Sequence, residues 1–235
     1  HEVGAAFARA FAEETTGPLD RPAAASTAPS DRGPILAVSG SCSAMTRLQI
    51  LVAIGAGFAE IAVDVAALWD PVAGRDEQTR IVAEACEQLG AGRSVIVHTC
   101  MGSADPRIGD LTACADEQSR TVRELHRELG DTLGRVVAQV LQRSDVRRIV
   151  VAGGDTSGRV QAHLGINAMR IAATENDGDA ICSVSSDDPI IDGLEVAFKG
   201  GQVGGVGYFA EIRDARTVVD SSPMHRTSEE TNDEL

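Results

Sequence analysis

Two short stretches combine glycine with hydroxyl side chains where an apolar run ends. Residues 40–43 read Gly-Ser-Cys-Ser and follow the run at 35–39, while residues 153–158 read Gly-Gly-Asp-Thr-Ser-Gly and follow the run at 148–152. Glycine permits positive φ and close approach of a ligand to the backbone. The first amides of a helix are unpaired donors at the positive end of the helix dipole. If each run is a strand that turns into a helix, each turn can bind an anion such as phosphate.

A third glycine-rich segment lies near the end of the chain. Residues 200–207 contain five glycines in eight positions, and Lys199 places a cation directly before them. So much glycine carries a backbone entropy cost that a plain connection does not require. We therefore expect this segment to contact a ligand, with a flexible connection as the alternative. Lys199 either neutralises a phosphate or is an ordinary surface lysine.

Simpler interpretations of the two turns remain open. Ser43, Asp155 and Thr156 are residue types that commonly cap helices, and a Gly-Gly pair is common in turns. Neither turn is a GxxxxGK[ST] phosphate loop, and neither is a GxGxxG dinucleotide motif after the first strand. Two such turns in one domain strengthen the case for a phosphate site, and two unrelated connections stay open as the alternative.

His98 and Cys100 form another candidate pair, because they lie two residues apart at the end of an apolar run. A cysteine–histidine nucleophile or a metal site is one interpretation. No third partner is evident in the sequence, so a structural role is favoured for both residues.

The pattern along the chain predicts alternating strands and helices. We expect strands at 35–39, 59–65, 94–98, 148–152, 168–173 and 194–198, and helices at 44–55, 76–89, 118–142 and 157–164, the third bent near Gly130 or Gly134. This alternation predicts a single α/β domain whose mostly parallel sheet has helices on both faces. The predicted organisation is an N-terminal helix and linker at 1–33, the α/β domain at 34–218 and a disordered acidic tail at 219–235.

The composition narrows the classes of partner. The chain has 235 residues, 43% of them hydrophobic, and a formal net charge of −14, which argues against binding to nucleic acid or to an anionic membrane surface. No apolar run is long enough to span a membrane, and residues 1–17 lack the pattern of a secretion signal. The five cysteines are odd in number and have no CxxC spacing, which favours a reducing cytoplasm over a disulfide framework or a zinc site.

Three motifs in this order resemble a known family. The segments SGSCSAMTRLQI, VAGGDTSGRVQAHLGI and FKGGQVGG look like the C-terminal nucleotide-binding domain of the four-carbon acid sugar kinases. The resemblance extends from the predicted first helix, near residues 1–14, to Ile212. It implies a kinase that phosphorylates a small sugar acid, such as erythronate or threonate, with ATP and Mg²⁺. It also implies that the sugar acid binds mainly to an N-terminal domain, carried in the same chain or in another one, and it leaves a homodimer open.

The resemblance also implies which residues contact the cofactors. The expected ATP contacts are Ser41 or Ser43, Gly153, Gly154, Asp155, Thr156 and Gly201. Asp155 is the expected residue for orienting Mg²⁺, since a hard cation prefers carboxylate oxygen. The chain departs from the family in having Asp155 where glutamate is more common, and in the sequence of the late glycine loop. No general base is assigned.

Two other functions are compatible with the same turns. A phosphosugar-binding isomerase would have similar turns rich in Ser and Thr, but it leaves the late glycine loop unexplained. A nucleotide-binding module without catalytic activity would bind ATP and transfer no phosphoryl group.

Overall fold

The computed structural model describes residues 33–70, 72–105, 111–175 and 179–215. Almost all of the predicted N-terminal segment 1–33, and all of the predicted tail 219–235, lie outside these residues. The described chain forms a seven-stranded sheet with the order β2-β3-β1-β4-β7-β6-β5. Its strands are β1 (Leu36–Ser39), β2 (Ala59–Ala62), β3 (Val95–His98), β4 (Arg148–Ala152), β5 (Ile166–Glu175), β6 (Asp179–Ser186) and β7 (Glu195–Lys199).

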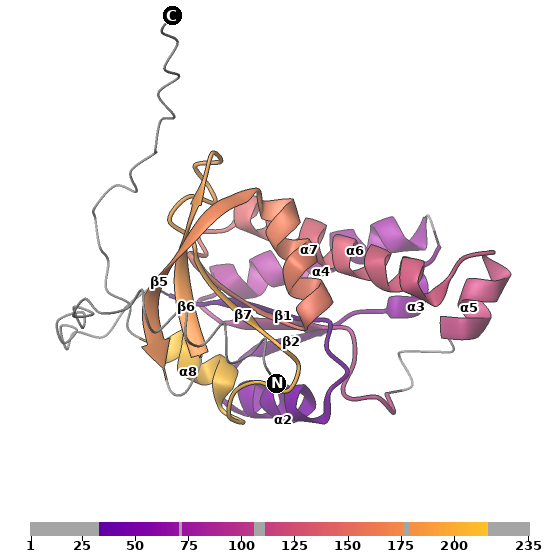
Figure 1. Ribbon diagram of the computed structural model, residues 1–235, viewed down its shortest axis with the longest axis horizontal. Helices are drawn as coiled ribbons and strands as arrows, with labels where there is room; N and C mark the ends of the chain where they lie inside the picture. The colour runs from indigo at the N-terminus through magenta and orange to yellow at the C-terminus, as the bar shows by residue number, and fades with distance from the viewer. Residues whose placement is uncertain (1–32, 71, 106–110, 176–178, 216–235) are drawn as a thin grey trace, which may run out of the picture.

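Helices cover both faces of this sheet. They are α2 (Ala44–Gly55), α3 (Val65–Leu68), α4 (Ala73–Gly90), α5 (Leu111–Glu117), α6 (Val122–Arg143), α7 (Gly154–Leu164) and α8 (Tyr208–Asp214). Figure 1 shows α4, α6 and α7 on one face and α2 with α8 on the other. The predicted α/β class is confirmed, and the predicted strands and helices between residues 35 and 198 are present with ends shifted by a few residues. Within the described residues, none of these helices is both long enough and apolar enough to cross a membrane.

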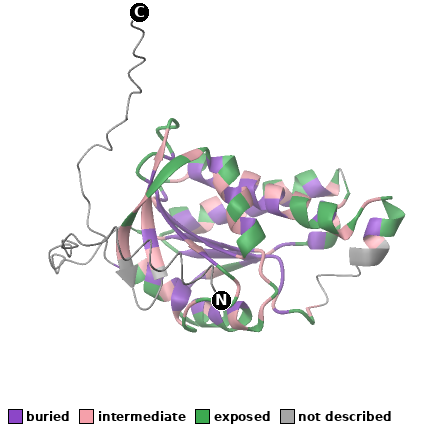
Figure 2. Cartoon of the chain, viewed as in Figure 1, coloured by how far each residue is buried: buried purple, intermediate pink, exposed green. Residues whose placement is uncertain are grey.

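The sheet divides the apolar core into two parts. Side chains alternate between the faces of a strand, so Leu36 and Val38 belong to the core under α4, α6 and α7, whereas Ile35 and Ala37 belong to the core under α2 and α8. The central strands are buried on both faces, as Figure 2 shows. Parallel strands covered on both sides are expected to be continuous apolar runs, which is why the sequence predicts them well.

The long helix α6 begins with a capping box. The Thr121 hydroxyl accepts a hydrogen bond from the Glu124 amide, and the Glu124 carboxylate accepts one from the Thr121 amide. The helix is continuous through Gly130 and Gly134, the two positions where a bend is predicted. A Cβ at Gly130 would crowd the side chain of Arg159, and one at Gly134 would overlap the ring of His163. These glycines therefore let α6 lie close against α7.

The far edge of the sheet differs from the prediction. β5 pairs with β6, and β6 pairs with β7, in antiparallel fashion, so the sheet ends in a hairpin. Neither β6 nor α8 is predicted from the sequence. β6 is rich in polar residues, and among its residues 180–186 only Ile181 and Val184 are buried, so its apolar signal is weak. α8 has only seven residues, and it is defined by the burial of its aromatic residues against the sheet.

A buried ion pair joins β4 to β7. Arg148 and Glu195 are register partners, and Arg148 Nε lies 2.7 Å from Glu195 Oε2. The same guanidinium donates to the carbonyls of Ile212 and Ala215 at 2.7 and 2.9 Å. Arg148 thereby links the sheet to α8 and to the residue that follows it.

Candidate functional site

The three glycine-rich segments meet at one edge of the sheet. They follow β1, β4 and β7, which are adjacent and parallel, so their carboxyl ends lie together. The Gly40 amide donates to the Ala152 carbonyl at 3.1 Å, and the Gly153 amide donates to the Lys199 carbonyl at 2.9 Å. The three loops therefore leave the sheet side by side, at the edge where ligands bind in open α/β sheets.

The late glycine loop is held against the start of α2. The Thr46 hydroxyl donates to the Gly201 carbonyl at 2.8 Å, and the Ser43 hydroxyl donates to the same oxygen. Gln49 Nε2 lies at 3.0, 3.2 and 2.9 Å from the carbonyl oxygens of residues 203, 204 and 205. This anchoring favours an ordered loop over one that is only a flexible connection. Thr46 and Gln49 are fully buried, and sequence reasoning missed Gln49.

The first two loops are in equally close contact. A Cβ at Gly40 would overlap Thr156 Oγ1, and Gly153 has φ of 116°, a conformation that favours glycine. A Cβ at Gly201 would overlap the Ser41 hydroxyl. The predicted site residues are thus brought together, and glycine is needed where the loops touch.

Replacing Gly40 by alanine is expected to lower the free energy of unfolding by about 1–3 kcal/mol, the usual effect of overpacking a tight contact. The added methyl group would have to displace the buried Thr156 side chain. Urea denaturation measures the change. Gly55→Ala is the matched control, because no atom lies within 4 Å of a Cβ at Gly55. Equal stability of the two variants would contradict the close contact.

Capping differs between the two turns. Ser43 caps α2, and its hydroxyl accepts from the Thr46 amide at 3.0 Å, so Ser43 has an ordinary structural role there. The N-cap of α7 is Gly153, and no side chain caps this helix. Asp155 lies exposed in the first turn, and Thr156 is buried. The interpretation of Asp155 and Thr156 as N-cap residues is therefore wrong, and the first amides of α7 have no side-chain acceptor at the cap.

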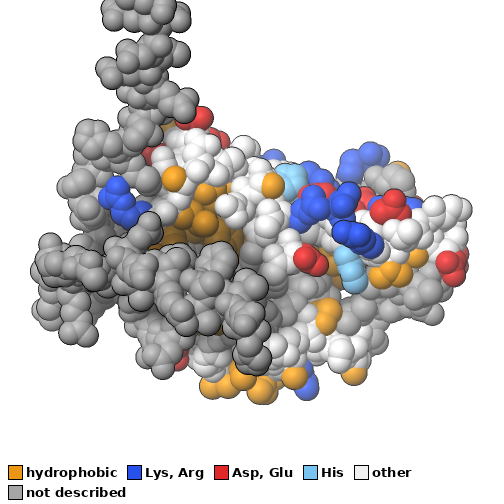
Figure 3. Space-filling view, in the orientation of Figure 1, with side chains coloured by type: hydrophobic (Ala, Val, Ile, Leu, Met, Phe, Trp, Pro, Cys, Tyr) orange, Lys and Arg blue, Asp and Glu red, His pale blue; other side chains and the backbone are white. Residues whose placement is uncertain are grey.

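A cavity of about 650 Å³ opens beside these amides, between α6 and α7. Its lining includes Gly154, Asp155, Arg123, His126, Arg127 and Arg159. Figure 3 shows the Arg and His side chains gathered over α6 and α7. Arg159 is also 3.5 Å from Asp131. On a chain with a net charge of −14, such a cluster favours an anionic ligand.

The basic residues of this cavity were not predicted as site residues. Three of them, at positions 123, 126 and 127, lie in the first turns of α6. Spacings of three and four residues place them on one side of that helix. The available signal was therefore this helical spacing, but the cavity exists only because α7 lies against α6.

Lys199 is buried, so the interpretation of this residue as an ordinary surface lysine is wrong. Its Nζ donates to the Gly200 carbonyl at 2.9 Å. Nζ also lies 5.4 Å from the centre of the Tyr208 ring, which allows a cation–π contact. Lys199 thus helps to fix the start of the late glycine loop.

His98 and Cys100 have different partners. His98 Nε2 lies 2.9 Å from Glu60 Oε1, whereas Cys100 Sγ lies 2.9 Å from Cys42 Sγ. This arrangement gives no support to a cysteine–histidine nucleophile. Among the described residues, no group of three or more His, Cys, Asp or Glu side chains could hold a metal ion.

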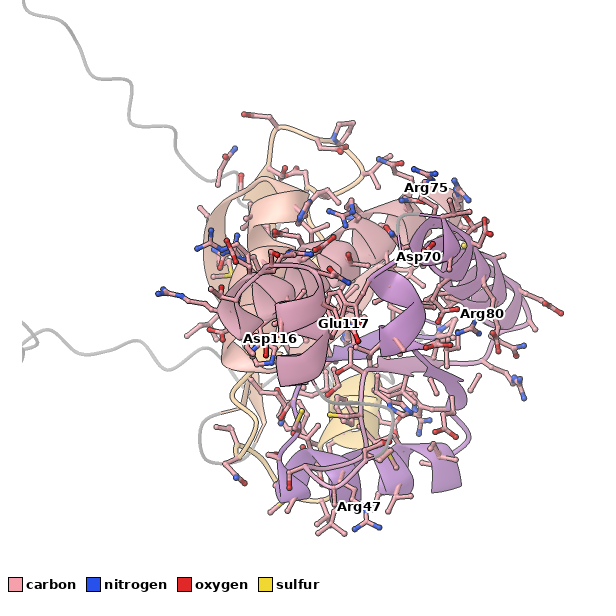
Figure 4. The ribbon with its side chains drawn as sticks, turned by 90° about the vertical axis from the view of Figure 1, so that its right-hand side faces the viewer. Arg47, Asp70, Arg75, Arg80, Asp116 and Glu117 are labelled. Atoms are coloured by element: carbon pink, nitrogen blue, oxygen red, sulfur yellow. The ribbon has the colours of Figure 1, made fainter. Side chains whose placement is uncertain are left out.

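Asp155 still fits a role with Mg²⁺. Mg²⁺ commonly binds one or two carboxylates together with the phosphates of a nucleotide, and keeps several waters. An exposed carboxylate beside uncapped helix amides and a basic cavity matches that donor set. Figure 4 views the molecule from the side at which the parallel strands end. In this view Arg47 points outward from α2 at the bottom, and Asp116 and Glu117 lie above it on α5.

The fold and the site define an α/β domain whose candidate ligand site lies at the carboxyl ends of β1, β4 and β7. Residues 36–209 match the family model described as a nucleotide-binding C-terminal domain. The chain belongs to this family, and the predicted resemblance to the four-carbon acid sugar kinases is confirmed.

Similar curated proteins are named as sugar-acid kinases. The chain is 37% identical over 182 residues to a 3-oxo-isoapionate kinase of Paraburkholderia graminis. This match covers 77% of the chain and 39% of that kinase. The chain is 30% identical over 213 residues to a 3-oxo-tetronate kinase of Methylobacterium radiotolerans, covering 90% and 46%, respectively. It is 29% identical over 140 residues to a D-threonate kinase of Salmonella typhimurium, covering 60% and 33%. The chain therefore spans less than half the length of these relatives.

A solved structure has the same fold. It is a domain of unknown function, DUF1537, from Bordetella bronchiseptica, crystallised with bound citrate as a domain-swapped dimer. The TM-score is 0.60 at 21% sequence identity, and the match covers 79% of this chain and 42% of that one.

Proposed function

We propose that this chain is the ATP-binding domain of a kinase that phosphorylates a four-carbon sugar acid related to erythronate or threonate. The observation that carries the proposal is the meeting of three glycine-rich loops beside a basic cavity, at the carboxyl ends of β1, β4 and β7. Membership of a nucleotide-binding family and the names of the relatives support it.

Each part of the site has a proposed role in phosphate binding. The amides of Gly154, Asp155 and Thr156 bind phosphate oxygens at the start of α7. The preceding Gly153 amide is already paired with the Lys199 carbonyl, so Gly153 serves through its small size and its backbone conformation. Gly201 and the hydroxyls of Ser41 or Ser43 contact the nucleotide from the other side, and the arginines of the cavity balance negative charge. Mg-ATP supplies the phosphoryl group and partial neutralisation of its charge, so the protein mainly has to position the reactants.

We assign the binding of the sugar acid mainly to another part of the enzyme, and we assign no general base. The relatives are more than twice as long as the matched region, which leaves room for a substrate domain in the same or a separate chain. Self-association into a homodimer and a cytoplasmic location remain predictions from the sequence. Nucleic acid and membranes are not proposed as partners.

Calorimetric titration with Mg-ATP, Mg-ADP and sugar phosphates tests the proposal. We expect both nucleotides to bind and sugar phosphates not to bind. Absence of Mg-ATP binding up to millimolar concentrations would overturn the proposal, and binding of sugar phosphates alone would favour the isomerase. A non-catalytic module is distinguished by ATP binding without phosphoryl transfer when the sugar-acid domain is supplied.

Asp155→Asn is expected to weaken Mg-ATP binding about tenfold, which corresponds to about 1.4 kcal/mol. The substitution removes the carboxylate charge that orients Mg²⁺ but keeps the size of the side chain. ATP in the presence of EDTA should bind both proteins alike or bind the variant more tightly. The control is Asp145→Asn, an exposed residue just beyond the opposite end of α6. An equal loss with and without Mg²⁺ would contradict the role in metal binding.

A further inference from the structure

Two thiols meet at the rim of the site, and the proposed kinase function uses neither of them. Cys42 lies in the turn between β1 and α2, and Cys100 lies two residues after the end of β3. Their sulfur atoms are 2.9 Å apart, although the residues are 58 positions apart in the chain. A disulfide has an S–S distance of about 2.05 Å, so bond formation requires an approach of about 0.9 Å.

The two thiols have different surroundings. Cys42 is exposed, whereas Cys100 is buried. The thiol of Cys100 donates to Cys42 Sγ and to the Ser41 carbonyl, which lies 3.5 Å from Cys100 Sγ. The hydrogen bond from Cys100 lowers the pKa of Cys42 to about 7, against the opposing effects of burial and of Asp105. The pKa of Cys100 is raised, first by the interaction with Cys42 and then by burial. Cys42 is thus the exposed nucleophile, and Cys100 is the second thiol that can react with it.

Two other cysteines make useful comparisons. Burial raises the pKa of Cys86 and of Cys182, which makes both thiols poorer nucleophiles at neutral pH. Both are only partly exposed. The thiolate is the form that reacts with peroxide, so Cys42 should react before either of them.

We propose that Cys42 and Cys100 are a peroxide-sensitive dithiol that closes to an intramolecular disulfide at the rim of the nucleotide site. The thiolate of Cys42 attacks one oxygen of hydrogen peroxide, the O–O bond breaks, and the departing hydroxide takes up a proton to become water. The product is a sulfenic acid on Cys42. The sulfur of Cys100 then attacks Cys42 Sγ, and the S–O bond breaks. The hydroxyl group leaves with the Cys100 proton as a second water. Two thiols are oxidised, and one peroxide is reduced.

The bond would restrain the loop that carries two predicted ATP contacts. Cys42 lies between Ser41 and Ser43, and both hydroxyls lie close to Gly201. Drawing Cys42 toward Cys100 moves these neighbours and ties the turn to the loop after β3. We expect the oxidised protein to bind Mg-ATP at least about tenfold more weakly. This effect rests on the proposed function, whereas the disulfide itself does not.

Thiol mapping tests the disulfide without any nucleotide. The fully reduced chain is treated with a small excess of hydrogen peroxide, alkylated, digested and analysed by mass spectrometry. We expect a linked pair of peptides containing Cys42 and Cys100, with a loss of about 2 Da, since two thiol hydrogens leave. Dithiothreitol should restore both thiols. Cys42→Ser and Cys100→Ser should each abolish the linked pair, and the matched controls Cys86→Ser and Cys182→Ser should retain it.

The order of the two steps has its own test. In Cys100→Ser, the sulfenic acid on Cys42 cannot be resolved by Cys100, so dimedone should label Cys42. In the unsubstituted chain this label should be much weaker. Labelling of Cys42 to the same extent in both proteins would overturn the role of Cys100.

Several outcomes would overturn the proposal. These are both thiols free after treatment, a sulfinic acid on Cys42 with Cys100 unchanged, or a link between two molecules. A disulfide that leaves the affinity for Mg-ATP unchanged would overturn its effect on the site. If the reduced chain binds no nucleotide, the proposed function is wrong. The peptide mapping then still shows whether the Cys42–Cys100 disulfide forms.

Discussion

Replacing Arg148 by methionine is expected to lower the free energy of unfolding by about 3–5 kcal/mol, the usual result of removing one partner of a buried ion pair. The side chains of Arg148 and Glu195 are 1% and 4% exposed, so the substitution removes the Arg148 charge from beside a buried carboxylate. The variant also leaves the carbonyls of Ile212 and Ala215 without the guanidinium donor. Urea denaturation followed by circular dichroism measures the loss.

Two controls separate the charge pair from a general effect of losing arginine. Arg120→Met removes the partner of Glu128 in a much more exposed pair, and it should cost no more than about 1 kcal/mol. The double variant Arg148→Met/Glu195→Leu should regain much of the lost stability, because both buried charges are removed together. Equal losses for Arg148→Met and Arg120→Met would contradict the buried ion pair.

The same arginine illustrates what the sequence could predict about the fold. The apolar run after Arg148 correctly predicts β4, since a strand buried on both faces needs continuous apolar residues. Nothing local to that run indicates that the arginine is itself buried. Its burial depends on Glu195, 47 residues away, and on the carbonyls at the end of α8, a helix that the sequence pattern does not predict. Such partners are set by tertiary contacts.

In the candidate site, too, the features set by neighbouring residues are predicted from the sequence, and the features set by contacts between distant segments are not. The three loops are predicted because each combines glycine with polar residues directly after a strand, and parallel strands bring their carboxyl ends together. The basic cavity was missed because it forms between α6 and α7, whose close approach depends on Gly130 and Gly134. The Cys42–Cys100 contact was missed for the same reason, since it joins loops after two different strands.

Gly154→Val is expected to weaken Mg-ATP binding at least about a hundredfold, equivalent to about 2.8 kcal/mol. Gly154 is the first residue of α7, and no atom lies within 4 Å of a Cβ placed there. The fold therefore has room for valine, and stability should stay the same or rise slightly, because valine is a better helix former than glycine. The new side chain occupies the space through which phosphate oxygens approach the first amides. Calorimetry gives the affinity, and urea denaturation gives the stability.

Gly158→Val is the matched control for this substitution. Gly158 lines the same cavity about one turn further along α7, and it also has open space around a Cβ. The two glycines differ mainly in distance from the uncapped start of the helix, so only Gly154→Val should disturb phosphate binding. Similar losses in both variants would mean that the cavity wall, and not the helix start, contacts the nucleotide. Unchanged affinity in both would mean that the Gly153–Gly154 turn is a plain connection between β4 and α7.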